Sequence, residues 1–199
     1  KDYENNLSTD CIYDGFTSIS DPIRKEVFTA INLCQKAGID VKILTGDNTL
    51  TATTIAHELG LITPNSLILD AKTVDSMSDY ELRGKLKNIS VIGRSNPLTK
   101  LRVVNILMDM GKSVAVTGDG INDAPSLKRA EVGIAMGITG TEVSKETADI
   151  ILLNDSFATI VKAIESGRGL YENFQKFIQF QQIVNVAALF PVSYTHLRA

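Results

Sequence analysis

Two short apolar runs that end in the same tripeptide constrain the fold of this chain more than any other feature. Residues 42–47 read KILTGD, and residues 114–119 read VAVTGD. Short apolar runs bounded by turn residues are typical of strands buried in a parallel sheet. Ligands of open α/β sheets bind outside the carboxyl ends of the strands, so we expect Asp47 and Asp119 to face one site.

Helical and strand-like patterns alternate along most of the chain. Helices are predicted at 21–38, 49–58, 70–88, 97–110 and 141–147, and strands at 11–19, 40–44, 90–92, 113–116, 132–136 and 149–153. In the first helix, Val27, Ile31 and Leu33 are expected on the apolar side. This alternation predicts an α/β fold with a Rossmann-like, doubly wound parallel sheet.

The last quarter of the chain has a different character. Residues 157–189 contain no proline and predict one long helix, with Gly167 and Gly169 as candidate interruptions. The apolar run 183–190 is shorter than the roughly 20 residues of a membrane span. Residues 191–199 turn polar and are interpreted either as the end of a truncated span or as an unrelated tail.

Charge and cysteine content exclude several classes of protein. Lys and Arg number 20 against 23 Asp and Glu, for a net charge of −3. Binding to nucleic acid needs clustered basic residues, so nucleic acid is not expected as the main partner. The two cysteines, Cys11 and Cys34, show no metal-ligand spacing and suit a reduced intracellular domain.

The string GDGINDAP at 118–125 places Asp119 and Asp123 four residues apart, where a strand passes into a helix. Mg²⁺ prefers oxygen ligands, usually one or two carboxylates with phosphate and water, so this spacing predicts a magnesium–phosphate site. Asn122 adds an amide that could donate to a phosphoryl oxygen. The alternative is a glycine turn with an aspartate cap.

Three further positions suggest contact with an anion. Thr45, Gly46 and Asp47 offer a hydroxyl and backbone N–H groups just before a helix, although a plain cap at Asp47 or Asn48 explains the same residues. Lys100 lies in the first turn of a helix, where the helix dipole disfavours a cation. A phosphate partner or simple solvation would account for Lys100, and also for Arg94.

Together, TGDN at 45–48 and GDGINDAPSLK at 118–128 resemble the P-type ATPases, whose phosphorylation domain belongs to the haloacid dehalogenase superfamily. DPIR at 21–24 resembles the hinge that returns from the nucleotide domain. The resemblance implies four segments: 1–20, the end of the nucleotide domain and the hinge; 21–165, the phosphorylation domain; 166–190, a stalk and the start of a membrane helix; and 191–199, the tail.

The resemblance also implies roles for the site residues, with ATP as substrate and Mg²⁺ as cofactor. Thr45, Gly46 and Asp47 would contact the phosphoryl group or nucleotide, Lys100 would neutralise phosphate charge, Arg94 and Asn122 would assist, Asp119 would ligate Mg²⁺, and Asp123 would be a second ligand or lie behind the first. Within the family, RSNPLTK at 94–100, IAMGITGTEV at 134–143 and KFIQFQQIVNVA at 176–187 look closest to plasma-membrane-type calcium pumps. Asn185 would then coordinate the transported ion.

One departure from the family is large: its phosphorylation motif, Asp-Lys-Thr-Gly, is absent from the chain. The chain alone is therefore expected neither to turn over ATP nor to move an ion. The full protein would be an integral membrane protein with this domain in the cytoplasm. The alternatives are a P-type pump for another cation, a non-catalytic interaction module, and a soluble phosphatase of the same superfamily, whose Asp-x-Asp motif does not occur here.

Overall fold

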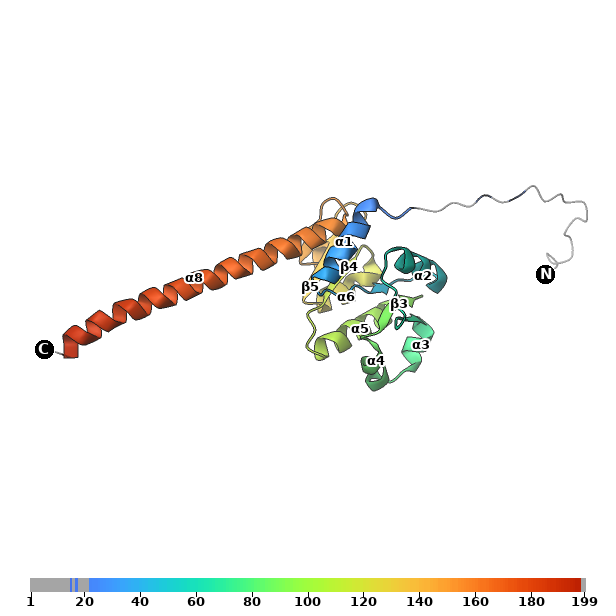
Figure 1. The fold of residues 1–199 in the computed structure, drawn as a ribbon. Helices are drawn as coiled ribbons and strands as arrows, with labels where there is room; N and C mark the ends of the chain where they lie inside the picture. Colours follow the sequence, from blue (N-terminus) through green and yellow to red (C-terminus); the bar gives the residue numbers. More distant parts are fainter. Residues whose placement is uncertain (1–14, 16, 18–21, 198–199) are drawn as a thin grey trace, which may run out of the picture.

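Short parallel strands flanked by helices form the body of the molecule, and one long helix extends from it (Figure 1). The computed structural model describes residues 15, 17 and 22–197. The strands are β1 (Ile43–Leu44), β2 (Leu67–Asp70), β3 (Ile89–Gly93), β4 (Ala115–Gly118), β5 (Val132–Met136) and β6 (Ile150–Leu152). The helices are α1 (Lys25–Lys36), α2 (Thr49–Glu58), α3 (Ala71–Ser76), α4 (Asp79–Lys85), α5 (Pro97–Asp109), the 3₁₀ turn η1 (Ile121–Asp123), α6 (Ala124–Arg129), α7 (Glu142–Thr147) and α8 (Phe157–Leu197).

The strands form two three-stranded parallel sheets, with orders β1-β3-β2 and β4-β5-β6. Leu44 pairs with Ile92 in the first sheet, and Thr117 pairs with Ile134 in the second. The predicted Rossmann-like α/β class is thus confirmed. Among the described residues, β1 and β4 do not pair with each other, so each is an edge strand.

Three apolar clusters hold this body together. β3 is buried along its whole length because helices cover it and strands flank it on both sides. Ile92 packs with Leu82, Leu86 and Val103 from the helices of the first sheet. The third cluster joins the second sheet to the start of α8, through residues that are almost fully buried: Ile134, Leu152 and Ile160.

The prediction for the first helix was correct about its existence and wrong about one residue of its buried face. Ala30, Ile31 and Cys34 are buried, whereas Leu33 is 48% exposed. A helical repeat of 3.6 residues places position 34, rather than 33, on the face of positions 27, 30 and 31. Leu33 was therefore wrongly predicted to be on the buried side of the helix, because its apolar character was considered without its position in the helical repeat.

The single helix predicted over 70–88 was also wrong. The run LILD forms strand β2, and its last residue, Asp70, accepts a hydrogen bond from Lys72 N and caps α3. A new helix begins after Ser78, whose hydroxyl and main chain form a capping box with Glu81. The predicted strand at 11–19 lies outside the described residues except at positions 15 and 17.

The long C-terminal helix was predicted correctly as one helix starting at 157, but it continues beyond the predicted end at 189 to Leu197. α8 runs for 41 residues without interruption at Gly167 or Gly169, and it includes Pro191. Its first turns pack against α1, where Arg168 donates to the Ala37 carbonyl at 3.3 Å, and the remainder projects away (Figure 1). No helix in the described part of the chain is long and apolar enough to span a membrane.

Candidate functional site

The first Thr-Gly-Asp tripeptide is fastened to the end of β3 by main-chain hydrogen bonds. Ser95 N donates to the Thr45 carbonyl at 2.8 Å, and Arg94 N donates to the Asp47 carbonyl at 2.8 Å. The Thr45 hydroxyl accepts from Asp47 N at 3.1 Å. Asn48, not Asp47, caps α2, because its side chain accepts from Leu50 N.

The second tripeptide is shaped by the side chain of Asp123. A Cβ atom on Gly118 would overlap the Cβ of Asp123, so the close approach requires glycine at 118. The Asp119 carbonyl accepts hydrogen bonds from Thr141 N at 2.8 Å and from Ser144 Oγ at 3.2 Å. The main chain of Asp119 is thereby fixed, while its side chain is exposed.

An ion pair between Lys100 and Asp123 crosses from α5 to η1. Lys100 Nζ lies 2.6 Å from Asp123 Oδ1, and the two side chains are only 18% and 12% exposed. α5 begins with Pro97 after the cap Asn96, which places Lys100 in its first turn. A carboxylate partner thus explains this lysine, and the solvated-lysine alternative is wrong.

The two tripeptides meet at a pocket of about 270 Å³ between β1 and β4. Its walls are Leu44, Thr45, Lys100, Thr117, Gly118, Asp119, Asp123 and Met136. Four predicted site residues are therefore brought together: Thr45, Lys100, Asp119 and Asp123. Asp47 and Asp119 were expected to face one site, but only Asp119 lines this pocket, together with Thr45 from the first tripeptide.

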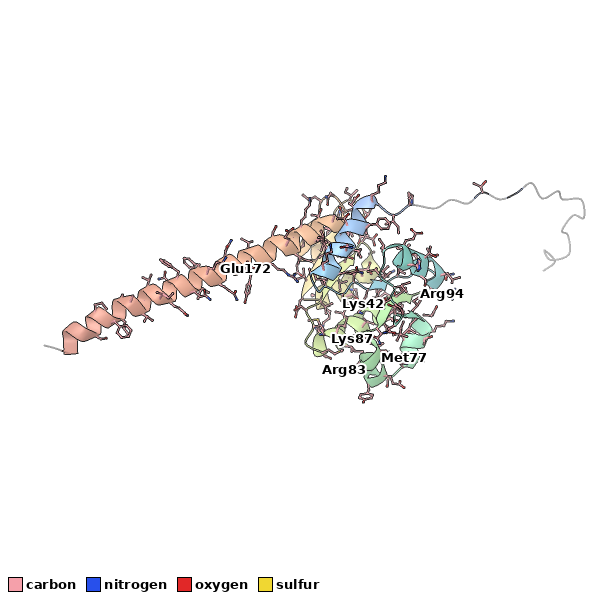
Figure 2. All side chains as sticks on the ribbon, viewed as in Figure 1. Lys42, Met77, Arg83, Lys87, Arg94 and Glu172 are labelled. Atoms are coloured by element: carbon pink, nitrogen blue, oxygen red, sulfur yellow. The ribbon has the colours of Figure 1, made fainter. Side chains whose placement is uncertain are left out.

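The other predicted site residues lie outside the pocket walls. Arg94 is exposed, has a φ of 52°, and points its Nε to within 3.8 Å of Asp70 Oδ2. Figure 2 shows Arg94 at the periphery of the body. Gly46 and Asn122 are exposed, and Asn185 is exposed on the projecting part of α8.

The pocket suits a hard cation that keeps part of its water. No group of three or more His, Cys, Asp or Glu side chains that could hold a metal occurs within residues 22–197. Mg²⁺ is commonly held by only one or two carboxylates, with water and phosphate oxygens completing its shell. Asp123 Oδ1 is engaged by Lys100, so the exposed Asp119 carboxylate is the better-placed ligand.

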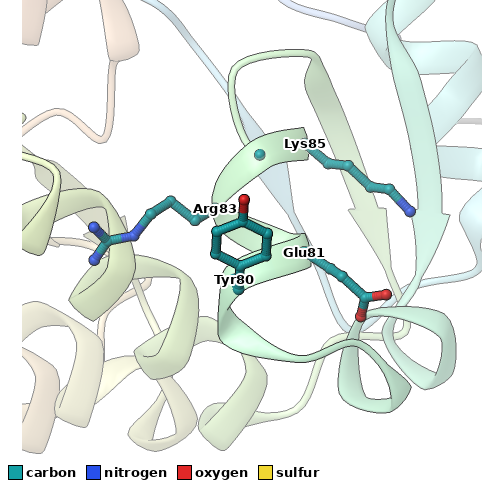
Figure 3. Close-up of a pocket in the computed structure, with 5 residues that line it drawn as sticks. Tyr80, Glu81, Arg83 and Lys85 are labelled. Atoms are coloured by element: carbon teal, nitrogen blue, oxygen red, sulfur yellow. The ribbon is translucent and has the colours of Figure 1, made fainter.

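A second hollow, of about 460 Å³, lies on helix α4. Figure 3 shows Tyr80, Glu81, Arg83 and Lys85 projecting from α4 in different directions rather than towards a common point. Tyr80 is 88% exposed, and Glu81 is occupied by its capping box. These side chains do not converge on a ligand.

The sequence analysis missed Asp155, which lies between β6 and α8. Its carboxylate accepts hydrogen bonds from the backbone N–H groups of Gly137, Ile138 and Thr139 at 2.7–3.0 Å, and from the Thr139 hydroxyl at 2.9 Å. Partial desolvation would raise the pKa of Asp155, but these donors outweigh it and lower the pKa to about 2. The partners lie 16–18 positions earlier, so no local pattern could reveal them.

The comparison with protein families agrees with this geometry. The model of the haloacid dehalogenase-like hydrolases matches residues 5–131, which is more than half of the chain. The chain belongs to this family. The match spans α1 to α6, and so includes Thr45, Lys100, Asp119 and Asp123 of the pocket.

The chain is also similar to calcium-transporting ATPases. It is 52% identical over 180 residues to "Calcium-transporting ATPase 7, plasma membrane-type" of Oryza sativa subsp. japonica, covering 88% of this chain and 17% of that protein. It is 46% identical over 182 residues to "Calcium-transporting ATPase 2" of Schizosaccharomyces pombe, covering 92% of this chain and 14% of that protein. The chain thus spans less than a fifth of the length of these relatives.

Two solved structures share the fold and part of the sequence. A zinc-transporting PIB-type ATPase in the E2·Pi state superposes with a TM-score of 0.60 at 32% identity, over 79% of this chain and 21% of that one. The catalytic domain of the CPx-ATPase CopB-B gives a TM-score of 0.56 at 26% identity, over 73% and 46%. The predicted resemblance to P-type ATPases is confirmed.

Proposed function

We propose that this chain supplies the Mg²⁺- and phosphate-binding part of the site at which an ATP-driven P-type cation pump forms and hydrolyses an aspartyl-phosphate. One observation carries the proposal: a mostly buried Lys100–Asp123 pair lies beside the exposed Asp119 in a pocket that also holds Thr45. A fixed ammonium, an exposed carboxylate and a hydroxyl, gathered where the carboxyl ends of β1 and β4 meet one pocket, suit a phosphate with its metal.

The proposed roles follow from the contacts of each side chain. When bound, Mg²⁺ would screen the charge of the transferring phosphoryl group. Asp119 would hold the metal, and Asp123 would hold Lys100 with its ammonium directed into the pocket. Lys100 would then contact phosphoryl oxygens without first changing its position. Such preorganised positive charge is the main source of catalysis in phosphoryl transfer.

The nucleophile would come from outside this chain. The edge strands β1 and β4 flank the pocket, and within the described part of the chain each pairs with a neighbour on one side only. Their other main-chain N–H and C=O groups could pair with an intervening strand that carries the phosphorylated aspartate. We therefore expect the chain alone to bind Mg²⁺ and phosphate but not to turn over ATP. A soluble phosphatase is the weaker candidate, because its Asp-x-Asp motif does not occur here.

Calcium is the proposed transported ion, and the membrane the proposed location of the full protein, with this domain on the cytoplasmic side. Support comes from relatives described as plasma-membrane-type calcium-transporting ATPases. Because one similar structure is a zinc-transporting ATPase, transport of another cation is the alternative proposal. Asn185 remains the proposed contact for the transported ion.

The metal site can be tested directly on this chain. Titration with Mg²⁺ in the presence of inorganic phosphate, followed by amide resonances, should give a dissociation constant that rises at least about tenfold in Asp119→Asn. Asp149→Asn is the matched control, since Asp149 Oδ2 accepts from Gly133 N at the opposite end of the second sheet. Equal Mg²⁺ affinity in the wild type and Asp119→Asn would contradict the assignment.

The transport activity needs a separate test on the longer gene product that contains this sequence. ATP-dependent uptake of radioactive Ca²⁺ into vesicles should be abolished by Asp119→Asn and retained by Asp149→Asn. Uptake of another cation would support the proposal of a P-type pump and contradict the proposal that calcium is the transported ion. A longer gene product without an Asp-Lys-Thr-Gly segment would rule out the pump.

A further inference from the structure

Asp155 lies outside the pocket, yet it fixes the loop that runs from the pocket wall to the main chain of Asp119. This loop, residues 137–140, follows β5, whose last residue, Met136, lines the pocket. The Asp155 carboxylate accepts from three consecutive N–H groups of the loop and from one hydroxyl. A carboxylate is well suited to this task because it accepts at both oxygens and offers no competing donor.

The far end of the loop is bonded to Asp119. Thr141 N donates to the Asp119 carbonyl at 2.8 Å. Ser144, which is fully buried, donates towards the same carbonyl at 3.2 Å and the Thr141 carbonyl at 2.7 Å. The main chain of Gly140 passes so close to the Met136 carbonyl that a Cβ there would overlap its oxygen, so this approach requires glycine at 140.

We propose that Asp155 is a positioning residue for the pocket. Through the 137–140 loop and Thr141, it sets the main chain of Asp119 and hence the direction of the Asp119 carboxylate. The expected effect on metal affinity rests on the proposed function. The placement of Thr141 and Asp119 by Asp155 does not depend on that function. The hydrogen-bond partners of the Asp155 carboxylate are residues 137–139, and none of these lines the pocket.

The test compares Asp155→Asn with Asp149→Asn, which makes the same charge change next to the opposite end of strand β6. Asparagine presents an NH₂ group where one of the carboxylate oxygens accepted, so part of the N–H cluster loses its partner. In Asp155→Asn, we expect the amide resonances of Gly120 and Thr141 to shift and the Mg²⁺ dissociation constant to rise about tenfold. In Asp149→Asn, neither should change.

A second variant guards against loss of folding. Thr139→Val removes only the hydroxyl that donates to Asp155 Oδ2 and should give smaller shifts at the same two amides. Folded Asp155→Asn or Thr139→Val protein with unchanged Gly120 and Thr141 resonances would overturn the proposal, as would unchanged Mg²⁺ affinity in folded Asp155→Asn.

The two proposals fail in different ways. If the wild-type chain binds no Mg²⁺, the proposed metal site fails, and the Gly120 and Thr141 amides alone decide whether Asp155 positions Asp119. A purely structural role for Asp155 would lower the free energy of unfolding without selective shifts at these amides, and that result would also overturn the proposal.

Discussion

Lys100 and Asp123, 23 positions apart, form a 2.6 Å ion pair that ties the first turn of α5 to the turn after β4. Both side chains are mostly buried, so neither charge can easily return to water if its partner is removed. Removing one partner of such a pair lowers the free energy of unfolding more than replacing both partners does, because the remaining charge stays buried without its counter-ion.

Lys100→Met should therefore lower the free energy of unfolding by about 3 kcal/mol, because it leaves the Asp123 carboxylate buried without a cation. The double variant Lys100→Met/Asp123→Asn should recover part of this loss. Urea unfolding measures both values. Lys145→Met breaks the Lys145–Glu142 pair, whose glutamate side chain is 82% exposed, and is the control that should cost less than about 1 kcal/mol. Equal losses in the two lysine variants would contradict the buried-pair account.

Gly118→Ala and Gly46→Ala make the same change in the two Thr-Gly-Asp tripeptides and should behave differently. At 118 the new methyl group would overlap Asp123, so we expect a loss of about 2 kcal/mol and displacement of the Asp123 side chain. At 46 its nearest neighbour would be the Ser95 carbonyl at 3.8 Å, an ordinary contact, and the change should stay within about 0.5 kcal/mol. Thermal or urea unfolding distinguishes them, and similar stabilities would refute the packing argument.

Asp155 should make stability depend on pH in the acid range. Its pKa is lowered to about 2 in the folded chain, against about 3.9 for an unperturbed aspartate. The stabilisation is therefore complete above the unfolded pKa and is lost as pH falls towards the folded pKa. The stability difference between wild type and Asp155→Asn should shrink from pH 5 to pH 2. A difference independent of pH in urea unfolding at pH 5, 4, 3 and 2 would show that the charge is not responsible.

Gly84→Ala should stabilise the chain. Gly84 lies inside α4 with nothing within 4 Å of the position that a Cβ would occupy, so alanine adds helix propensity without a clash. We expect a gain of about 0.5–1 kcal/mol in the free energy of unfolding. Gly111→Ala is the contrasting variant, because Gly111 has a φ of 71° and alanine there should destabilise. A loss in Gly84→Ala would mean that α4 is not helical in solution.

Local patterns were sufficient for the elements whose neighbours in sequence are also their neighbours in space. β3, β5 and α5 follow from apolar runs and from the Asn96-Pro97 start signal, whereas β4 lies two residues later than its predicted range of 113–116. The break between α3 and α4 could have been predicted, since Ser78 followed three residues later by Glu81 is a capping-box signal. Strand β2 was harder, because its four residues are all half-buried and run directly into a helix.

Long-range contacts explain what the sequence could not reveal about the site. Asp119 and Asp123 are close in sequence, and their turn was predictable. No local sequence pattern predicts that Lys100 pairs with Asp123, or that the Asp155 carboxylate accepts hydrogen bonds from the N–H groups of residues 137–139. These pairings exist only once two helices and a sheet have packed.

The two points where the chain enters and leaves the α/β body lie at one corner. Arg24, just before α1, donates from Nη1 to the Asp155 carbonyl at 3.1 Å, and α8 begins two residues later at Phe157. Further along α8, Arg168 donates to the carbonyl of Ala37, at the other end of α1. These contacts couple the beginning of α8 to both ends of α1. Force applied along α8 would therefore pass to the end of α1 at Ala37 before it reached Asp155, at the start of α8.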